Sequence, residues 1–470
     1  LVTVQESDFS EDFAEIKYDS VPRLDATTSK VLADQQLGSL SEYKSQYVVS
    51  STSTQINYQG HPVRVAYLEY ADVFKWFNNT KNGLPAYMLI DLVSQKVTAV
   101  NCIEKFGEGI KYSPTELFNE KLIRHLRFQY PTAILDTPNF EIDDEGHPYW
   151  ITPVLDRTIG LFGGTDVKGA IVTDALNGES TYLDIDAVRN DKSYNWIDVV
   201  YSEALLIQQY NYHGKLSQGF WNSIIFQNDV NIASQGSGNI AMDDDVWVYT
   251  GVTSSESDAS NFGFIFCNQR TKELRYYKNG GAMEYSAQQS AQDAVQNYGY
   301  RATFPILLDI EEQPTYFMSL YGDSYTVKGY ALVNLDDKTV VGTGLLDVEK
   351  SDAGALNAAV ENYIAALKAK NIVDASADAD DYKVDSNNDT VINENGEDVT
   401  EANTISGEIT DIMTSVNDGN TVYYLQIDGK YYYIAVNDCM DVLLMKKGDT
   451  VTVTFDKDAD TFVKAKSIKK

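Results

Sequence analysis

Four short segments of the chain share one pattern of apolar and polar positions. In each, an apolar run ends in Asp or Asn, a spacer of polar residues follows, and a second alternating run begins. The alternation gives each strand one apolar face and the spacer supplies a turn, so every segment predicts a β-hairpin. The four segments are Met88–Val97, Ile171–Ser180, Ile265–Leu274 and Leu332–Val340.

A further strand is expected in front of each hairpin. Two of these strands begin with the same Gly-His-Pro triplet, and proline is tolerated where a strand starts. Helices are expected before two of the units, because Ser113–Glu116 forms a capping-box pattern and Ser286 precedes an alanine-rich run. The repeated unit is therefore predicted to be one helix and three strands, several copies of which bury the sheet faces. The preceding strands are Gly60–Tyr67, Gly146–Thr152, Asp245–Thr250 and Gln313–Ser319.

The composition and the apolar pattern change twice in the last third of the chain. Ser351–Asn371 has the apolar stripe of a helix, whereas Asp374–Thr404 holds ten acids, one lysine and one aromatic residue and is predicted to be a solvated linker. Within it, Asp385–Asp389 matches the first ligand positions of a calcium loop. The turn glycine and the final acid of such a loop are missing, so a linker is favoured over a calcium site.

From Ile405 onward the pattern is all-β. Five short strands separated by turns such as Asp418-Gly419 and Asp428-Gly429 are typical of a small OB-like barrel. A nucleic-acid-binding barrel needs basic residues around its aromatic ones, and Lys430 is the only base among the tyrosines. Core and surface packing is the favoured role of these tyrosines, with a glycan or partner face as the alternative. They are Tyr423, Tyr424, Tyr431, Tyr432 and Tyr433.

Composition narrows the classes of partner. The 470 residues suggest about three domains, and 37 basic against 69 acidic residues give a net charge of −32. Such a charge argues against nucleic acid and disfavours anionic membrane surfaces. The chain begins at Leu1 rather than Met, which leaves room for a leader or a membrane anchor upstream of it. An acidic, tyrosine-rich and cysteine-poor composition is common on bacterial surfaces, so we expect an extracytoplasmic, cell-surface or membrane-anchored bacterial protein.

The residues that most often perform chemistry are sparse. The three cysteines lie far apart and form no metal-binding motif, so they are expected to be small buried residues. The four histidines occur singly, and no nucleophile, phosphate-binding or zinc-protease motif is present. We therefore predict no catalytic residue, no cofactor and no metal site. The cysteines are Cys102, Cys267 and Cys439, and the histidines are His61, His125, His147 and His213.

Acidic clusters precede several of the expected strands. Their position favours solvated turns, although Asp243–Asp245 could hold a hard cation and paired carboxylates could hydrolyse glycosides. The clusters are Asp143–Glu145, Asp243–Asp245 and Glu311–Glu312. The glycine-containing stretch Phe162–Asp166 is expected to be a turn between strands, since no helix follows it to bind phosphate.

The repeated unit resembles a PepSY-type module, best over residues 284–344 and next over Ser113–Tyr182. That resemblance implies small α+β units outside the cytoplasm that bind or restrain partners. Residues 1–350, including Leu161–Gly169, also resemble an uncharacterised bacterial membrane-anchored family that carries CvpA-like or cell-shape labels. The stretch Trp196–Gly238 departs from a plain repeat.

These observations predict an α+β fold of tandem PepSY-like helix-plus-antiparallel-sheet repeats, followed by a small all-β OB-like barrel. The expected parts are an N-terminal segment (1–54), repeats one and two (55–195), a helical insertion with repeats three and four (196–350), a helix (351–373), the acidic linker (374–404) and the barrel (405–470).

The favoured function is a non-catalytic surface or envelope protein that binds or scaffolds a protein partner. Three alternatives stay open: a PepSY-like regulator or inhibitor of an envelope peptidase, a self-assembling structural subunit, and a glycan-active enzyme that uses paired carboxylates.

Overall fold

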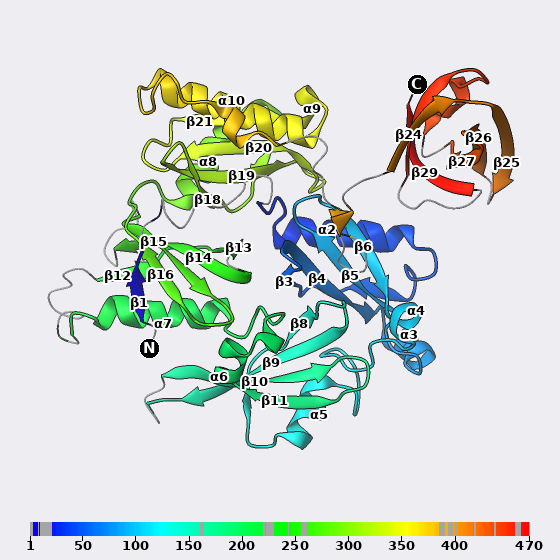
Figure 1. The fold of residues 1–470 in the computed structure, drawn as a ribbon. Helices are drawn as coiled ribbons and strands as arrows, with labels where there is room; N and C mark the ends of the chain where they lie inside the picture. The colour runs from blue at the N-terminus through cyan, green and yellow to red at the C-terminus, as the bar shows by residue number, and fades with distance from the viewer. Residues whose placement is uncertain are drawn as a thin grey trace. The chain divides into compact units, whose positions relative to one another are not determined.

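The computed structural model divides the chain into two compact units. The first comprises Leu1–Asp389 with Glu394–Gly396, and the second comprises Thr390–Asn393 with Glu397–Lys470. Figure 1 shows the ribbon with its labelled elements. The structure describes residues 3–7, 9, 21–159, 164–219, 221, 230–242, 244–254, 261–384, 391–392, 398–399, 403–417, 420–436, 439–455 and 462–469.

Four antiparallel sheets in the first unit share one topology (Figure 1). In each, a long strand pairs on one side with the next strand of a meander and on the other with two short strands that precede it. Sheet 1 contains β2 (Tyr47–Val49), β3 (Thr54–Tyr58), β4 (His61–Tyr70), β5 (Ala86–Asp91) and β6 (Val97–Asn101). Sheet 2 contains β7 (Ile134–Leu135), β8 (Asn139–Ile142), β9 (Pro148–Arg157), β10 (Thr165–Asp174) and β11 (Ser180–Asp184).

The remaining two sheets of this unit follow the same plan. Sheet 3 contains β12 (Asn231–Ala233), β13 (Gly238–Met242), β14 (Asp245–Ser254), β15 (Gly263–Asn268) and β16 (Leu274–Tyr277), and β1 (Val4–Glu6) adds to β16 in parallel. Sheet 4 contains β17 (Arg301–Ala302), β18 (Ile306–Ile310), β19 (Gln313–Tyr321), β20 (Val327–Asn334) and β21 (Val341–Leu345).

All four expected hairpins are confirmed, as β5–β6, β10–β11, β15–β16 and β20–β21. The repeated Asp or Asn at the end of the first strand has a physical role in each. Its Oδ1 accepts hydrogen bonds from the backbone N–H groups two and three residues later, which closes the turn. The four turn residues are Asp91, Asp174, Asn268 and Asn334.

Helices connect or cover the sheets. They are α2 (Ala26–Ser39), α3 (Val73–Asn79), α4 (Cys102–Phe106), α5 (Leu122–Gln129), α6 (Ile185–Asn190), α7 (Glu203–Leu216), α8 (Glu284–Ala294), α9 (Leu346–Glu349) and α10 (Asp352–Ala369), with short 3₁₀ turns at Lys192–Tyr194, Gln296–Tyr298, Ala379–Tyr382 and Met440–Leu444. The helix expected over Ser351–Asn371 is α10, and Ser351 caps it by accepting from the N–H of Gly354. Over the described residues, no helix combines the length and the apolar character needed to cross a membrane.

The predicted fold class, tandem PepSY-like helix-plus-sheet repeats followed by a small OB-like barrel, is wrong. The sheets of the first unit have five or six strands instead of three, because two short strands share one edge of the long strand. The capping-box pattern at Ser113–Glu116 forms a turn, and α5 begins only at Leu122. In place of a five-stranded barrel, the second unit has a six-stranded sheet.

That sheet of the second unit has the order β24 (Asn403–Glu408), β28 (Thr450–Phe455), β29 (Phe462–Lys469), β27 (Lys430–Ala435), β26 (Asn420–Ile427) and β25 (Asp411–Asn417). The outer strands β24 and β25 are consecutive in the chain, with only Ile409 and Thr410 between them. β22 (Val391–Ile392) and β23 (Asp398–Val399) form a separate pair. The turn at Asp418-Gly419 and the loop Asp385–Asp389 lie outside the described residues.

Large aromatic side chains fill the interfaces between the sheets of the first unit. Tyr67 of sheet 1 packs on Trp150 of sheet 2, with ring centroids 4.9 Å apart. A second cluster joins sheets 3 and 4 and includes Tyr249, Phe264 and Tyr316, all almost fully buried. The four sheets consequently share continuous apolar cores, which no single sheet could form alone.

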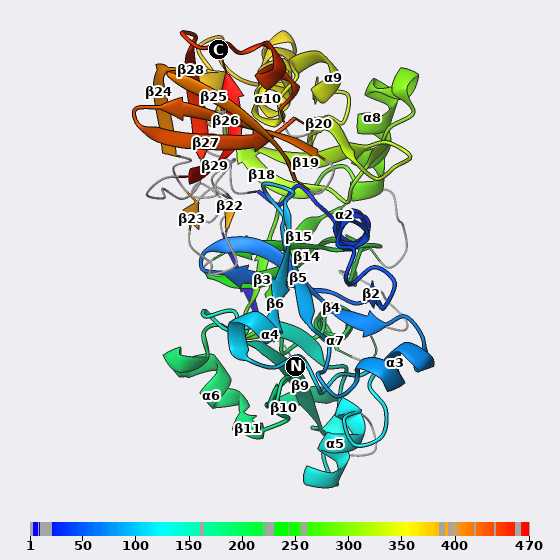
Figure 2. The same cartoon turned by 90° about the vertical axis from the view of Figure 1, so that its right-hand side faces the viewer.

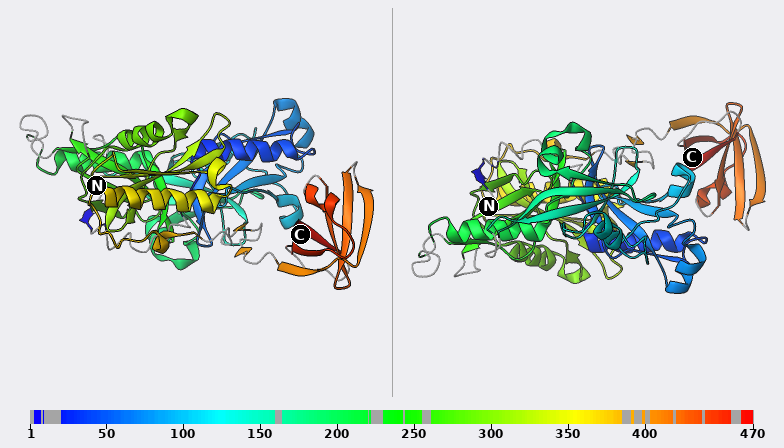
Figure 3. Two further views of the ribbon diagram at one scale, coloured as in Figure 1. Left: turned by 90° about the horizontal axis from the view of Figure 1, so that it is seen from above. Right: turned by 90° about the horizontal axis from the view of Figure 1, so that it is seen from below.

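Helix α10 lies directly on the outer face of sheet 4 (Figure 3). Two glycines of β21 make this close approach feasible. A Cβ atom at Gly344 would lie 1.9 Å from the carbonyl oxygen of Ala355, and one at Gly342 would lie 2.3 Å from the backbone nitrogen of Tyr363. The helix backbone therefore rests on bare strand backbone.

We expect Gly344→Ala to destabilise the first unit by about 3 kcal/mol, because the added methyl group forces α10 away from the strand. Gly38→Ala is a matched control, since Gly38 lies in α2 with open space where its Cβ would be. That control should be neutral or slightly stabilising. Melting curves followed by tryptophan fluorescence measure both changes, and equal melting temperatures for the two variants would contradict the close-packing argument.

Candidate functional site

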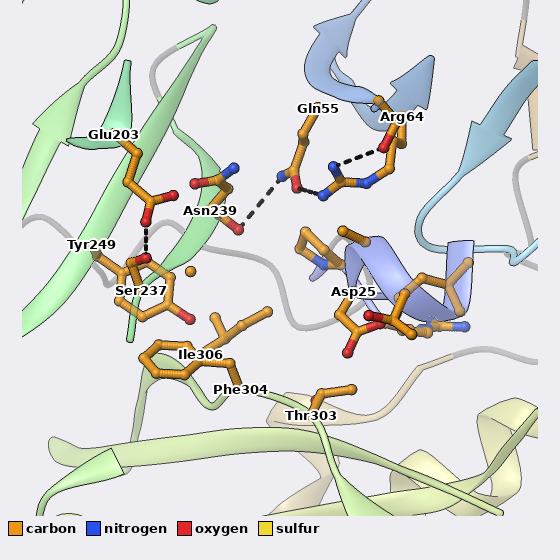
Figure 4. Close-up of a pocket in the computed structure, with 17 residues that line it drawn as sticks. Asp25, Gln55, Arg64, Glu203, Ser237, Asn239, Tyr249, Thr303, Phe304 and Ile306 are labelled. Atoms are coloured by element: carbon orange, nitrogen blue, oxygen red, sulfur yellow. Dashed lines mark hydrogen bonds between the residues drawn. The ribbon is translucent and has the colours of Figure 1, made fainter. Parts of the chain in front are cut away.

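A cavity of about 440 Å³ lies where sheets 1, 3 and 4 of the first unit meet (Figure 4). Its wall combines strands from all three sheets with the first residue of α7 and the segment that leads into α2. The lining residues are Pro22, Arg23, Leu24, Asp25, Ala26, Thr27, Ser53, Gln55, Arg64, Glu203, Ser237, Gly238, Asn239, Tyr249, Thr303, Phe304 and Ile306.

Arg64 is the unusual member of this wall. It lies in β4 between buried valines and is itself only 8% exposed. Its guanidinium donates to Gln55 Oε1 at 3.1 Å and to Ser53 Oγ at 3.4 Å, both neutral acceptors. Within the described residues, its Nε has no hydrogen-bond partner and no carboxylate forms an ion pair with it. The cavity thus holds a buried positive charge without a matching negative one.

Burial lowers the pKa of Arg64 to about 10, and the charge of Asp25 opposes that shift. The guanidinium still carries its charge at neutral pH. Asp25 is engaged elsewhere, because its Oδ1 accepts from the N–H and the hydroxyl of Thr28 and caps α2. A guanidinium in a site of low dielectric attracts carboxylate or phosphate strongly, with a fork of donors that suits both.

The wall opposite Arg64 has a different chemistry (Figure 4). Glu203 accepts a hydrogen bond from the hydroxyl of Ser237. Below them lie the ring of Phe304 and the side chain of Ile306, next to the ring of Tyr249. The cavity therefore presents a cation at one end, a carboxylate at the other and an apolar floor between them, which suits a small ligand with one acidic group and several hydrogen-bonding groups.

Comparison with known proteins gives little. No family model and no curated protein matches the chain. Among solved structures it is similar to a variant of Synechocystis apocarotenoid oxygenase (12% identity, TM-score 0.17) and to a chimera of that enzyme with RPE65 (12%, 0.17), with 62% of this chain and 60% of the other covered in both cases. The chain thus spans about three fifths of the length of those chains. At these TM-scores the likeness supports no conclusion about fold or chemistry.

The cavity residues were not predicted from the sequence. Arg64 does leave a local signal, since it is a charged residue within a strand whose neighbours Val63, Val65 and Ala66 are all buried. Glu203 and Asp25 leave none, because they resemble ordinary acids in the first turn or at the cap of a helix.

The four histidines that the sequence highlights all lie outside the cavity wall. His125 contacts the carbonyl oxygen of Gly178 at 2.8 Å, and His213 packs near Tyr210. His147 forms a 3.1 Å ion pair with Asp174. Burial opposes the charge of His147, but the contact with Asp174 outweighs it and raises the pKa of the imidazole. This ion pair joins the β8–β9 turn of sheet 2 to the β10–β11 hairpin of the same sheet.

The acidic clusters form structural contacts. Asp143 Oδ1 accepts from the backbone N–H groups of Glu145 and His147 and so closes the β8–β9 turn. Asp245 pairs with Arg270 through both carboxylate oxygens, at 2.6 and 2.9 Å. Asp243 lies outside the described residues. No group of three metal-ligating side chains occurs in the part of the chain that the structure describes.

One pair of carboxylates is buried at the junction of sheets 1, 2 and 3. Glu141 is fully buried and accepts from the backbone N–H groups of Asp198 (2.8 Å) and Val199 (3.0 Å). Asp198 is 1% exposed, and its Oδ2 accepts from the N–H of Asn57 at 2.8 Å, while its Oδ1 has no partner among the described residues. Because Glu141 has two donors, it is the better-stabilised anion, and Asp198 is the better site for a proton.

Burial raises the pKa of Glu141 to about 8, and burial together with the charge of Glu141 raises the pKa of Asp198. An acid with a raised pKa in the folded state binds its proton more tightly there than in the unfolded chain. The stability that it contributes is complete below its unfolded pKa of about 4 and is lost as the pH rises through neutrality.

Asp198→Asn resembles the protonated form, since it keeps an acceptor for Asn57 and places an amide where Oδ1 has no partner. We expect the variant to equal the wild type near pH 4 and to exceed it by about 1–3 kcal/mol at pH 8. Unfolding free energies measured across this range test the prediction. Parallel pH profiles for the two proteins would show that the pair does not titrate as inferred.

Proposed function

We propose that this chain is a non-catalytic binding protein whose cavity between sheets 1, 3 and 4 holds a small organic anion. The observation that carries the proposal is the buried guanidinium of Arg64, which has only neutral hydrogen-bond acceptors within the described residues. A buried charge without a counterion lowers stability. A ligand carboxylate or phosphate would supply that counterion. Binding of the ligand would therefore also remove the unfavourable free energy of burying the guanidinium.

The opposite wall narrows the class of ligand. The carboxylate of Glu203 and the hydroxyl of Ser237 suit hydroxyl or ammonium groups, and the ring of Phe304 offers a face for a sugar or hydrocarbon backbone. A sugar acid or a similar polyhydroxy carboxylate has this distribution of groups. A cavity of about 440 Å³ is large enough for one such molecule.

We further propose that the chain acts outside the cytoplasm. The support is compositional: a net charge of −32, 32 tyrosines and three cysteines. The three cysteines are free, and two of them are buried.

The test is a thermal-shift and calorimetric comparison of matched ligands. Glucuronate and galacturonate should raise the melting temperature, whereas glucose and galactose, which lack the acid, should not. Saturation at 100 times Kd corresponds to about 2.7 kcal/mol of added stability. Equal responses to acidic and neutral sugars, or none to a panel of sugar acids and organic phosphates, would overturn the proposal. Turnover of a ligand that a point change abolishes would overturn its non-catalytic part.

A further inference from the structure

The first unit carries a cluster of protruding aromatic side chains that do not line the cavity. Helix α3 occupies the β4–β5 connection, and its residues Phe74 and Phe77 are 74% and 64% exposed. Phe118 is 63% exposed and packs on Trp76, with centroids 5.8 Å apart. The ring of Phe77 also lies against Trp76, with centroids 4.9 Å apart, so two of the three phenylalanines pack on one buried indole and Phe74 lies on the same short helix. We call Phe74, Phe77 and Phe118 the aromatic face.

Two observations indicate that this exposure is specified by the fold. The indole nitrogen of Trp76 donates to buried Glu116 at 2.5 Å, which fixes the base of the face. The backbone of Phe118 has a φ of +52°, a conformation that is unfavourable for a bulky residue. Strain of this kind persists where the surrounding structure enforces it, and it is concentrated at functional positions.

The net charge of the segments around the aromatic face is positive, whereas that of the whole chain is negative. Residues 71–82 and 114–130 contain five Lys or Arg and three Asp or Glu, whereas the chain carries a net charge of −32. Three of these bases lie at the N-cap and in the body of α5: Lys121, Arg124 and Arg127, all exposed. The hydroxyl of Thr80, the residue after α3, donates to Glu120, two residues before α5, so the ends of the two connections are linked. Figure 2 labels both helices. Phe128 of α5 is also 74% exposed, with Arg124 over its ring.

We propose that the aromatic face and the basic residues of α5 dock on the interface of a lipid bilayer that contains anionic lipids. Side chains that are two thirds exposed protrude from the surface, which suits insertion among lipid headgroups better than contact with a flat protein surface. The flanking bases supply charge complementarity to anionic headgroups. The same surface repels the acidic remainder of the chain over about a Debye length of 8 Å. The protein is therefore expected to bind the membrane in one orientation, with the aromatic face toward the lipids.

The experiment is co-sedimentation of the full chain with vesicles of phosphatidylcholine, with and without phosphatidylglycerol. The wild type should bind, and more strongly to the anionic vesicles. The triple change Phe74→Ser, Phe77→Ser and Phe118→Ser should lower the partition coefficient at least tenfold on both. Lys121→Gln with Arg124→Gln should remove only the preference for anionic vesicles. Tyr285→Ser is the matched control, because Tyr285 is 74% exposed on α8, away from the face.

The variant Phe118→Gly distinguishes a loss of membrane binding from a loss of stability. Glycine accepts the positive φ, so this variant should melt at or above the wild-type temperature while it binds vesicles less well. Failure of the wild type to sediment with either vesicle overturns the proposal. Unchanged binding of the triple variant, or equal losses for it and Tyr285→Ser, overturns it as well.

Discussion

Arg64→Met is expected to abolish the response of the protein to sugar acids while it raises the melting temperature of the ligand-free chain. Both effects have one cause. The wild type holds a guanidinium at 8% exposure against two neutral acceptors, so its burial is unfavourable until an anion enters. Methionine fills a similar volume without charge, which stabilises the empty protein and removes the group that recognises the ligand.

The expected sizes differ between the two effects. Loss of a charge-assisted contact in a buried site should cost about 3 kcal/mol of binding free energy, or roughly 100-fold in Kd. The gain in stability should be smaller, about 1–2 kcal/mol, because Gln55 loses a donor when the guanidinium is removed. All five tryptophans precede residue 250, so tryptophan fluorescence reports the melting of the first unit.

Arg64→Lys provides the control for charge. It keeps a cation in the cavity but loses the planar fork, so it should bind sugar acids with intermediate affinity. A ligand response that survives in Arg64→Met would place the binding site elsewhere. A lower melting temperature of Arg64→Met without ligand would show instead that the guanidinium is a structural group.

The sequence predicted the local structure of the first unit well. The four hairpins follow from short-range alternation and from the Asp or Asn that closes each turn, as the contacts of Asp174 and Asn268 show. Helix α10 follows from its apolar stripe. These features depend on residues only a few positions apart, which is the range that periodicity and capping patterns describe.

The sequence failed where the decisive partners are distant. Ser113–Glu116 satisfies the capping-box pattern, yet Glu116 turns inward to accept from Trp76, forty residues away, and the helix starts later. The two short strands that share an edge of each long strand were likewise missed. One strand of each pair, such as β7 or β17, has only two or three residues and so has too little alternation to detect. The cavity itself joins residues 22–27, 53–64, 203, 237–249 and 303–306, which no local pattern connects.

Arg23→Met should have the opposite effect to Arg64→Met, although the two arginines line the same cavity. Arg23 is 3% exposed and forms an ion pair with Asp352 at the start of α10. Asp352 also accepts from the hydroxyl of Tyr330 and from Gln95 of sheet 1. The backbone of Arg23 adds two further links, donating to Leu92 O of sheet 1 and accepting from Ser319 Oγ of sheet 4.

This network joins the first sheet to the last through a segment that precedes both. Removal of the guanidinium leaves Asp352 partly buried without its cation, so we expect a loss of about 3 kcal/mol and a lower melting temperature of the first unit. Asp352→Asn in the same background should recover part of that loss, because it removes the uncompensated charge while an amide oxygen still accepts from Tyr330. If Arg23→Met melts with the wild type, or if the second change adds to the damage, the ion pair does not hold these sheets together. The contrast with Arg64→Met then decides the larger question: of two buried arginines in one cavity wall, the one whose loss stabilises the protein is the one held for a ligand.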